Sequence, residues 1–459
     1  MQSEIIRWRY ESADREDKSE IMERTKQETS LQIIVRRIKQ SITEPPERAC
    51  AIATKRLCAI IDRSMIQHAA IYRRSVDARK KDQIFFVYSV IVDVCIPSKM
   101  LRDAERFAQS LLRRADAVLA EDTTVSPVFG TETLPDRPVV VGFGPAGMFC
   151  ALLLAENGYR PIVIERGGDV QERIDAVEHF YRDGVLDGNT NIQFGAGGAG
   201  TFSDGKLMTR INDVYCQYVL RRFWEFGAPN SILTEAKPHI GTDILREVVS
   251  NIRDRIRAAG GTILFRTRME DLHTSGNRVV SLRTENGDIS CGTVTLAIGH
   301  SARDTYQTMM QKGFDIIPKS FAVGVRIEHL QEEIDRAMYG DFAGNPLLGH
   351  AEYALAYHEG ENAVYSFCMC PGGEVVAAAS ESGGVVVNGM SRHARDGKNA
   401  NAALVVPVSC EDPIAFQRQL ERAAFEAAGA DYCAPQQTVG DFLRGLAGSA
   451  PGRVQPTYR

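Results

Sequence analysis

The sequence has few features of a membrane, secreted or fibrous protein. Tryptophan occurs only twice in 459 residues, and the hydrophobic residues, 44% of the total, form no run of about 18 that could cross a bilayer. The amino terminus, MQSEIIRWRYESADRED, lacks the apolar stretch of a secretory signal. The net charge of −5 is too small to indicate a membrane or nucleic-acid partner for the whole chain. We therefore expect a soluble globular protein.

The ten cysteines are scattered along the chain and do not show the spacing of a disulfide framework. They include no C-x-x-C pair and no Cys/His spacing of a zinc site, so we predict no metal. In a chain this long, such cysteines are typical of reduced thiols, and we expect a cytoplasmic protein.

The length suggests two or three domains at about 150 residues each. We interpret residues 1–29 as a charged tail and 121–136 as a linker. Between them, residues 30–125 have strand-like, helical, strand-like, strand-like and helical runs at 31–42, 46–62, 66–76, 83–96 and 100–120. This order predicts a ferredoxin-like βαββα accessory domain. Residues 137–315 predict the main part of an α/β nucleotide-binding domain with a β-meander at 262–298, and 316–459 predict a mostly antiparallel substrate or cap domain.

A basic patch lies in the first of these domains, at Tyr72-Arg73-Arg74 and Arg79-Lys80-Lys81. Such a patch can contact RNA phosphates. However, residues 1–137 carry 24 Lys and Arg against 21 Asp and Glu, an excess of only +3. We favour a solvated turn and expect no nucleic-acid partner.

The most informative motif is V-V-V-G-F-G-P-A-G at 139–147. Gly142 permits a tight turn after the strand, Gly144 lets the backbone approach a pyrophosphate, and Gly147 lets the next helix pack closely. That helix offers its first N–H groups to phosphates. Glu165 ends the following strand, 165 − 142 = 23 positions after the first glycine, where a carboxylate binds an adenosine ribose. This order favours a dinucleotide site over an ordinary glycine-rich turn.

A second glycine-rich segment, G-A-G-G-A-G, covers 195–200, but its flanks fit neither a core strand nor an amphipathic helix. We interpret it as a loop whose backbone N–H groups, with the hydroxyls of Thr201 and Ser203, line the phosphates of the dinucleotide or, if the dinucleotide is FAD, the edge of its flavin. A structural turn is the alternative. The run T-V-T-L-A-I-G at 293–299 predicts a buried strand that brings Gly299 near the cofactor.

Together these segments resemble the glutathione-reductase-like FAD superfamily. NTNIQFGAGGAGTFSDGKL, KPHIGTDIL, AIGHSARDT, YSFCMCPGG, VVNGMSRHARDGKNANAALVV and RRSVDARKK are similar to one branch, the uncharacterised FAD-dependent dehydrogenases of bacteria. The resemblance covers about residues 30–459. That branch usually has a glutamate where this chain has Ala196, and it ends with a glycine-rich segment that covers the flavin. We expect this chain, which stops at Arg459, to lack that segment.

The resemblance implies noncovalent FAD on a Rossmann-like domain, with a β-meander, an antiparallel α+β substrate domain and the N-terminal βαββα domain. It implies the pyrophosphate at Gly142, Gly144 and Gly147, and the ribose at Glu165. The backbone of Met269 would face the adenine. The further cofactor-binding residues that we expect are Pro145, Ala146, Arg166, Gly197, Gly198, Gly200, Thr201, Ser203, Asp204 and Gly299.

A flavin carries hydride chemistry itself, so the motif requires no catalytic side chain. The candidates are Cys368 and Cys370, whose side chains should point the same way from a strand, and His300, beside the nucleotide strand. Buried small side chains and a polar turn are the alternatives. Arg326 either faces a substrate anion or is paired with Glu328 on a solvated strand face.

We therefore expect an FAD-dependent oxidoreductase, a dehydrogenase that transfers hydride between a small-molecule substrate and flavin. No second nucleotide-binding fold is evident, so either NAD(P)H visits the flavin as a transient electron donor or the electrons come from elsewhere. The alternatives are a dehydrogenase that binds only NAD(P), and a non-catalytic remnant that binds a nucleotide or RNA.

Overall fold

The structure is a computed structural model that describes residues 28–97, 104–120, 125, 127–209, 211, 213–360, 362–448 and 450–458. The predicted tail, apart from its last two residues, and the start of the helix predicted at 100 lie outside this part. The chain forms two compact units. One comprises residues up to 124 together with 233–236, and the other comprises 125–232 and 237–459.

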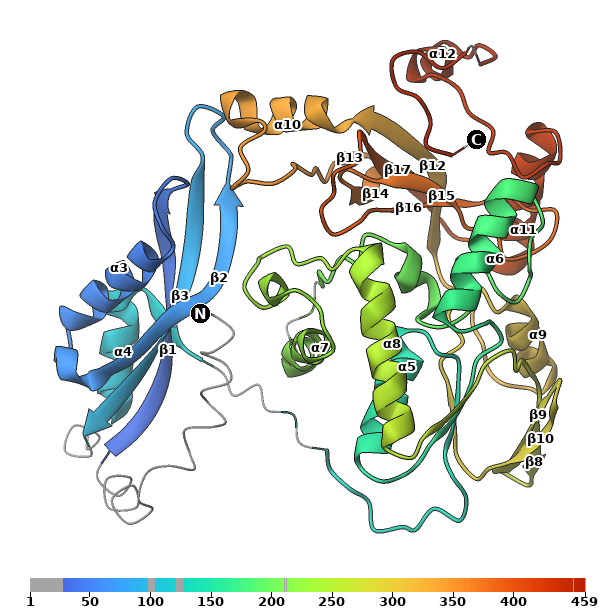
Figure 1. The fold of residues 1–459 in the computed structure, drawn as a ribbon, viewed down its shortest axis with the longest axis horizontal. Helices are drawn as coiled ribbons and strands as arrows, with labels where there is room; N and C mark the ends of the chain where they lie inside the picture. Colours follow the sequence, from blue (N-terminus) through green and yellow to red (C-terminus); the bar gives the residue numbers. More distant parts are fainter. Residues whose placement is uncertain are drawn as a thin grey trace. The chain divides into compact units, whose positions relative to one another are not determined.

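The first unit is a four-stranded antiparallel sheet with two helices (Figure 1). The strand order is β2-β3-β1-β4, the arrangement of a ferredoxin-like sandwich. Ala49, Ala53 and Leu57 recur every fourth residue and turn the apolar face of α3 toward the sheet. The elements are β1 (Glu28–Ser41), α3 (Glu47–Cys58), a 3-10 turn (Arg63–Met65), β2 (Ile66–Asp77), β3 (Phe85–Pro97), α4 (Ala104–Ala115) and β4 (Ala117–Leu119).

Strand β4 corrects the predicted helix over 100–120. The helix ends at Ala115, because Asp116 takes a left-handed backbone conformation with φ of 54°. The Asp116 carboxylate is held by Arg36 and Arg37 of β1, at 3.4 and 2.7 Å. The chain therefore reverses, and the β-branched Val118 pairs with Ile34 of β1.

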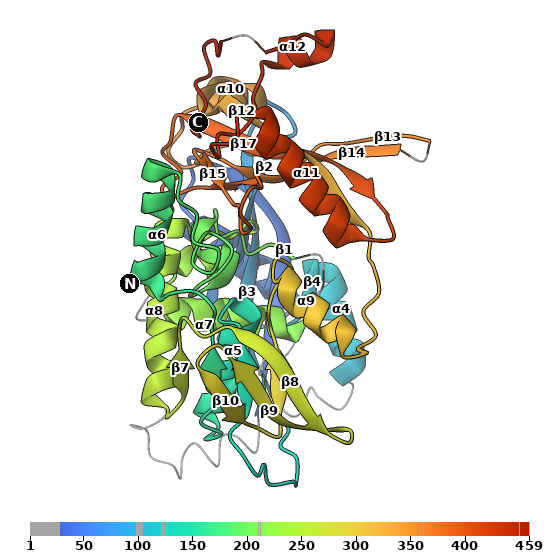
Figure 2. The same cartoon turned by 90° about the vertical axis from the view of Figure 1, so that its right-hand side faces the viewer.

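The second unit begins with a parallel sheet in the order β11-β5-β6-β7. α5 packs against β5 and β6, and it also contacts α8, which packs against β7. Figure 2 shows the meander β8-β9-β10 at the lower end of the view, with α9 packed against β8. The elements are β5 (Val139–Val141), α5 (Pro145–Glu156), β6 (Ile162–Ile164), α6 (Val170–Asp183), α7 (Val214–Glu225), α8 (Thr242–Ala258), β7 (Thr262–Leu264), β8 (Met269–Ser275), β9 (Arg278–Thr284), β10 (Gly287–Ser290), β11 (Val294–Leu296) and α9 (Arg303–Gln311).

Two of the strand-like runs predicted for the meander are each divided between two sheets. In the first run, Thr262–Leu264 joins the parallel sheet, and only Met269 begins the meander. In the last run, Gly287–Ser290 pairs with β9 but Val294–Leu296 pairs with β5. Length and apolar content alone do not show which sheet a short strand joins.

The remainder of the second unit is mostly antiparallel, as expected. Its four-stranded sheet has the order β12-β17-β14-β13, and β15 and β16 form a two-stranded ribbon. The elements are β12 (Phe321–Leu330), α10 (Gln331–Tyr339), β13 (Ala356–Glu359), β14 (Asn362–Cys370), β15 (Glu374–Ala377), β16 (Val387–Met390), β17 (Asn399–Val408), α11 (Pro413–Ala427) and α12 (Val439–Arg444).

None of the helices in the described ranges is both long and apolar enough to cross a membrane. No disulfide joins any of the cysteines, all of which lie in the described ranges. Within the same ranges, no group of His, Cys, Asp and Glu side chains is arranged to hold a metal ion.

Candidate functional site

The first and last glycines of the 142–147 motif are required by the packing of the chain itself. Gly142 has φ of 100°, and a Cβ added to it would lie 2.4 Å from the carbonyl oxygen of Ala297, which follows β11. A Cβ on Gly147 would lie 1.9 Å from the carbonyl oxygen of Gly142. A side chain at either position would therefore separate α5 from the strands it packs against.

Gly144 is different, because the chain leaves room for a side chain there. Its backbone is extended, with φ of −76°, and an added Cβ would meet no protein atom closer than 3.8 Å. Pro145 and Ala146, in the first turn of α5, are exposed. The first amides of a helix have no partner within it and attract phosphate. The surface at Gly144 thus fits a pyrophosphate that lies close to the backbone.

The second glycine-rich loop lies directly against this turn. The amide of Gly197 donates to the carbonyl oxygen of Phe143 over 2.8 Å. A Cβ on Gly198 would lie 2.9 Å from the Cα of Gly144, and one on Gly200 would lie 3.8 Å from the Pro145 ring. The structure therefore brings together two segments that are about fifty residues apart and that the sequence assigns to one site.

The hydroxyls of Thr201 and Ser203, which were predicted to line the cofactor, donate hydrogen bonds to carbonyl groups of this loop. Thr201 donates to the carbonyl oxygen of Ala196 over 3.0 Å, and its own carbonyl accepts from the Thr242 hydroxyl at the start of α8. Ser203 donates to Gly200. These bonds hold the short 3-10 helix Gly198–Phe202 against α8.

Glu165 also binds protein backbone. It is buried, and its carboxylate accepts hydrogen bonds from the amides of Phe143 (2.7 Å), Gly167 (2.9 Å) and Gly195 (2.9 Å). One carboxylate thereby ties both glycine-rich segments together. Since an ionised carboxylate has about four acceptor positions, one is left, and the ribose contact stays a prediction.

Arg173 is a functional candidate that the sequence reasoning missed. It is fully buried on α6, and its guanidinium donates to the carbonyl oxygens of Asn191 (2.9 Å), Ile192 (2.7 Å) and Ala196 (2.6 Å). Burial disfavours its charge and lowers its pKa to about 9. The sequence signal for its burial is its position on the same stripe of the helix as Val170, Val177 and Phe180.

Asp204 and Arg166 each form ion pairs with other side chains of the protein. Asp204 is buried and accepts from Arg395 at 2.9 and 2.5 Å, from Lys206 at 2.8 Å, and from the Ser391 hydroxyl. Burial raises the pKa of Asp204, but its two cationic partners outweigh burial and bring it down to about 2. Arg166 donates to Asp304 over 2.7 Å.

The remaining candidates lie around β8 and β11. Met269 is buried in the core next to Val139 of the parallel sheet. Gly299 is exposed and accepts from the Tyr306 hydroxyl, and exposed His300 contacts the Ser301 hydroxyl at 2.9 Å. These hydrogen bonds are with neighbours in sequence and not with the two glycine-rich loops.

One prediction about the antiparallel sheet, and one of the two alternatives given for Arg326, are wrong. Cys368 and Cys370 do not follow the simple alternation of a strand, because β14 loses register with β17 between Phe367 and Cys370, and Cys368 has φ of 45°. Glu328 is not the partner of Arg326, since it accepts from Thr457 over 2.7 Å. The Arg326 guanidinium instead donates to Asn401, to Asn388 and to the Cys368 carbonyl.

The basic patch of the first unit is partly neutralised. Arg74 pairs with Glu235 at 2.5 Å, and Arg79 pairs with Asp77 at 2.7 Å. These ion pairs are consistent with the solvated turn that we favour, and the absence of a nucleic-acid partner stays a prediction.

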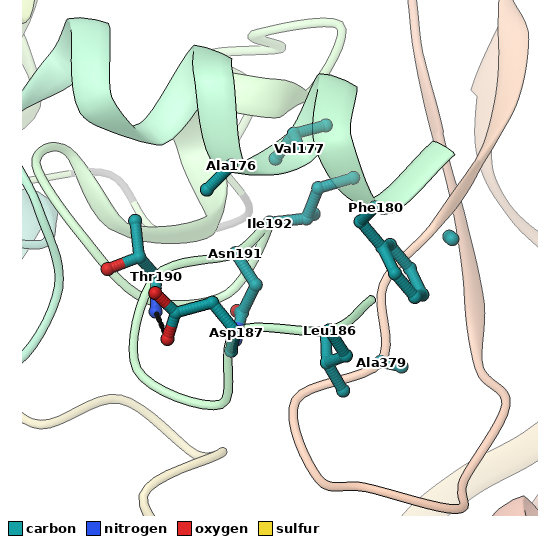
Figure 3. Close-up of a pocket in the computed structure, with 10 residues that line it drawn as sticks. Ala176, Val177, Phe180, Leu186, Asp187, Thr190, Asn191, Ile192 and Ala379 are labelled. Atoms are coloured by element: carbon teal, nitrogen blue, oxygen red, sulfur yellow. Dashed lines mark hydrogen bonds between the residues drawn. The ribbon is translucent and has the colours of Figure 1, made fainter. Parts of the chain in front are cut away.

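A shallow pocket lies beside α6 (Figure 3). Its polar side chains bond within the pocket wall: Asp187 accepts from the amide of Thr190 over 3.0 Å, and Asn191 donates to the Asp187 carbonyl. These hydrogen bonds shape the turn that leads to the second glycine-rich loop.

Comparison with known proteins identifies the family. Residues 320–459 match the family model "FAD-dependent protein, C-terminal domain-like", and residues 31–93 match a domain of unknown function, DUF8436. An uncharacterized protein of Clostridium beijerinckii is 46% identical over 420 residues, which cover 89% of this chain and 77% of that protein. The chain belongs to the same family as this relative, and its residues 320–459 form a domain of the FAD-dependent protein C-terminal type. Its parallel sheet is the one expected of a Rossmann-like domain.

Solved structures show only distant similarity. An L-amino acid deaminase from Proteus vulgaris is 13% identical, with a TM-score of 0.29 over 45% of this chain and 63% of its own, which is less than two thirds of its length. NikD, described as an unusual amino acid oxidase, is 16% identical, with a TM-score of 0.27 over 61% of this chain and 72% of its own. L-proline dehydrogenase from P. horikoshii is 14% identical, with a TM-score of 0.23 over 42% and 60%.

Proposed function

We propose that this chain binds FAD noncovalently where its two glycine-rich loops meet, and that it is a dehydrogenase acting on a small molecule. The space in front of Gly144 carries the proposal, because the packing of the chain does not require a glycine there. Membership in a family of FAD-dependent proteins favours FAD over NAD(P) as the dinucleotide.

The proposed roles follow from where each residue lies around the space in front of Gly144. The amides at Gly144, Ala146 and Gly147 would bind the pyrophosphate, helped by the positive end of the α5 dipole. Gly198 would border the same space from the second loop. Glu165 holds both loops in place through their backbone. When bound, the flavin supplies hydride transfer, and NAD(P)H is the proposed transient donor.

Replacing Gly144 by alanine tests the site. We expect the wild-type protein to be yellow, with the absorbance near about 450 nm that flavins share. Gly144→Ala should weaken FAD binding at least about tenfold, since the new methyl group occupies the surface that the pyrophosphate approaches. Its thermal stability without FAD should stay unchanged, because no protein atom lies within 3.8 Å of that methyl group. Calorimetric titration with FAD measures the affinity.

Gly130→Ala is the matched control, since an added Cβ there meets nothing within 4 Å. It should bind FAD as the wild type does. Equal FAD affinity of Gly144→Ala and the wild type would remove Gly144 from the binding site. A colourless wild-type protein that binds only NAD(P) would replace the proposal by the NAD(P)-only dehydrogenase. Bleaching of the flavin by NADH or NADPH without oxygen tests the donor.

A further inference from the structure

Cys368 and Cys370 lie at a break in β14. From Tyr365 to Phe367 this strand pairs with β17 residue by residue, and the register then shifts by one residue before Cys370 pairs with Asn401. Cys368 lies inside this break with φ of 45°, a conformation that non-glycine residues adopt only where the surrounding structure holds them there. The backbone therefore turns between the two thiols, where an ordinary strand would continue straight.

The two thiols differ in access. Cys370 is fully buried, whereas Cys368 is only partly buried. The Cys370 sulfur donates to the carbonyl oxygen of Cys368 over 3.5 Å, which brings it back toward its neighbour. A partly buried thiol with a fully buried thiol beside it fits an attacking and a resolving cysteine.

The charges around the pair favour a thiolate on Cys368. A hydrogen bond from Cys370 has the largest effect on its pKa, burial opposes it, and the cations Lys206 and Arg326 assist. Asp204 acts in the opposite direction. The net result is a lowered pKa for Cys368, while that of Cys370 rises well above its ordinary value. Of the two thiols, Cys368 is thus the one that loses its proton more readily.

The pair also lies close to the proposed cofactor site. Lys206 and Asp204, which act on both sulfurs, follow directly after the second glycine-rich loop and the 3-10 helix Gly198–Phe202. Residues of β14 and residues at the end of that loop therefore face the same small region of the second unit.

We propose that Cys368 and Cys370 are a redox-active dithiol that reduces a disulfide substrate and closes a disulfide of its own. The Cys368 thiolate attacks one sulfur of the substrate, the substrate S–S bond breaks, and the first thiolate leaves and takes up a proton. Cys370 then loses its proton and attacks the Cys368 sulfur, which releases the second thiolate. The substrate gains two electrons and the pair loses two. The supply of electrons back to the pair from bound cofactor rests on the proposed function, but the exchange itself does not.

Mass spectrometry of one peptide tests the proposal. Trypsin cuts after arginine and lysine, so residues 337–392 form a single peptide that contains these two cysteines and no others. The full-length protein is equilibrated with glutathione and glutathione disulfide at a series of ratios, quenched with acid, alkylated and digested. We expect one transition, from a doubly alkylated peptide to an unalkylated peptide lighter than the dithiol by two hydrogen atoms. A peptide that is doubly alkylated at every ratio would disprove the dithiol.

Single variants assign the roles. Cys370→Ala should trap one glutathione on Cys368, and Cys368→Ala should leave Cys370 unmodified in the folded protein. Cys410→Ser, which replaces a partly buried cysteine outside the peptide, should behave as the wild type. The rate of Cys368 alkylation should titrate below the pH range of an ordinary thiol and should shift to higher pH in Cys370→Ala, because the neighbouring thiol that lowers the Cys368 pKa is lost. An unshifted profile would contradict the pairing.

The outcomes separate this inference from the proposed function. A colourless protein that still forms the internal disulfide would refute FAD binding and leave the dithiol in place. A yellow protein without the disulfide would do the reverse.

Discussion

Glu165 and Arg173 are two buried side chains of opposite charge that bind backbone groups of the same loop. Glu165 accepts from the amide of Gly195, and Arg173 donates to the carbonyl oxygen of Ala196. Backbone groups left without partners in a buried loop are costly, and charged side chains make the stronger hydrogen bonds to them. Both side chains therefore determine the path of the second glycine-rich loop, even though neither belongs to it.

Replacing Glu165 by glutamine should destabilise the protein even without cofactor. One carboxylate oxygen becomes an NH₂ group that faces backbone N–H donors, so at least one buried amide loses its acceptor. We expect a loss of about 2 kcal/mol in the free energy of unfolding. Urea denaturation without FAD measures it, and Glu247→Gln, on the exposed side of α8, is the control. Unchanged stability would mean that Glu165 is kept free for a ligand.

At the scale of elements, the sequence predicted the turns and helices that are determined by residues close together in the chain. The glycine pattern predicted the tight turn at Gly142 and the close helix at Gly147, because the φ of 100° at Gly142 and the contact of Gly147 with the Gly142 carbonyl are both local. The sequence assigned the second loop to the same site, but it did not predict the close approach of Gly198 to Gly144. β4 was missed because its Ala-Val-Leu run continues the apolar pattern of α4, and the backbone reversal at Asp116 depends on arginines about eighty residues away. The roles of Arg173 and Asp204 also depend on partners distant in sequence.

The Asp204 cluster joins the end of the second loop to the segment after β16. Its folded-state pKa of about 2 lies below the ordinary 3.8, so its contribution to stability is complete above about pH 4 and disappears as the pH falls toward 2. Asp204→Asn leaves Arg395 and Lys206 without a counter-charge and should cost about 3 kcal/mol at neutral pH. Thermal unfolding of both proteins between pH 7 and pH 3 should show the difference shrinking in acid. A constant difference would show that the charge is unimportant.

In the second unit as a whole, Arg303 connects α9 to the antiparallel part that follows it in the sequence. It lies at the start of α9 and is 5% exposed, and it donates to Glu381 at 2.8 Å and to Glu421 of α11 at 2.6 Å. Both glutamates belong to the segment that matches the C-terminal family model. A buried cation thus ties α9 to the antiparallel part.

Removing this cation should weaken the cooperativity of unfolding. Arg303→Met leaves two glutamates close together without their shared partner, at a cost of about 3 kcal/mol, and we expect calorimetry to show a broadened or split transition. Arg418→Met is the comparison, since Arg418 binds the same Glu381 but its side chain is 40% exposed, so its loss should cost below about 1 kcal/mol. Equal effects of the two substitutions would contradict a joining role for Arg303.

The carbonyl contacts of Arg173 have one more consequence. A glycine-rich loop is normally among the most mobile parts of a chain, and immobilising one during association lowers affinity by about 1 kcal/mol for each residue that becomes ordered. Here three carbonyl groups between Asn191 and Ala196 are already fixed to a buried side chain. The entropy of that segment is lost when the polypeptide folds, so under the proposed function a dinucleotide would meet a rigid loop and lose little affinity in ordering it.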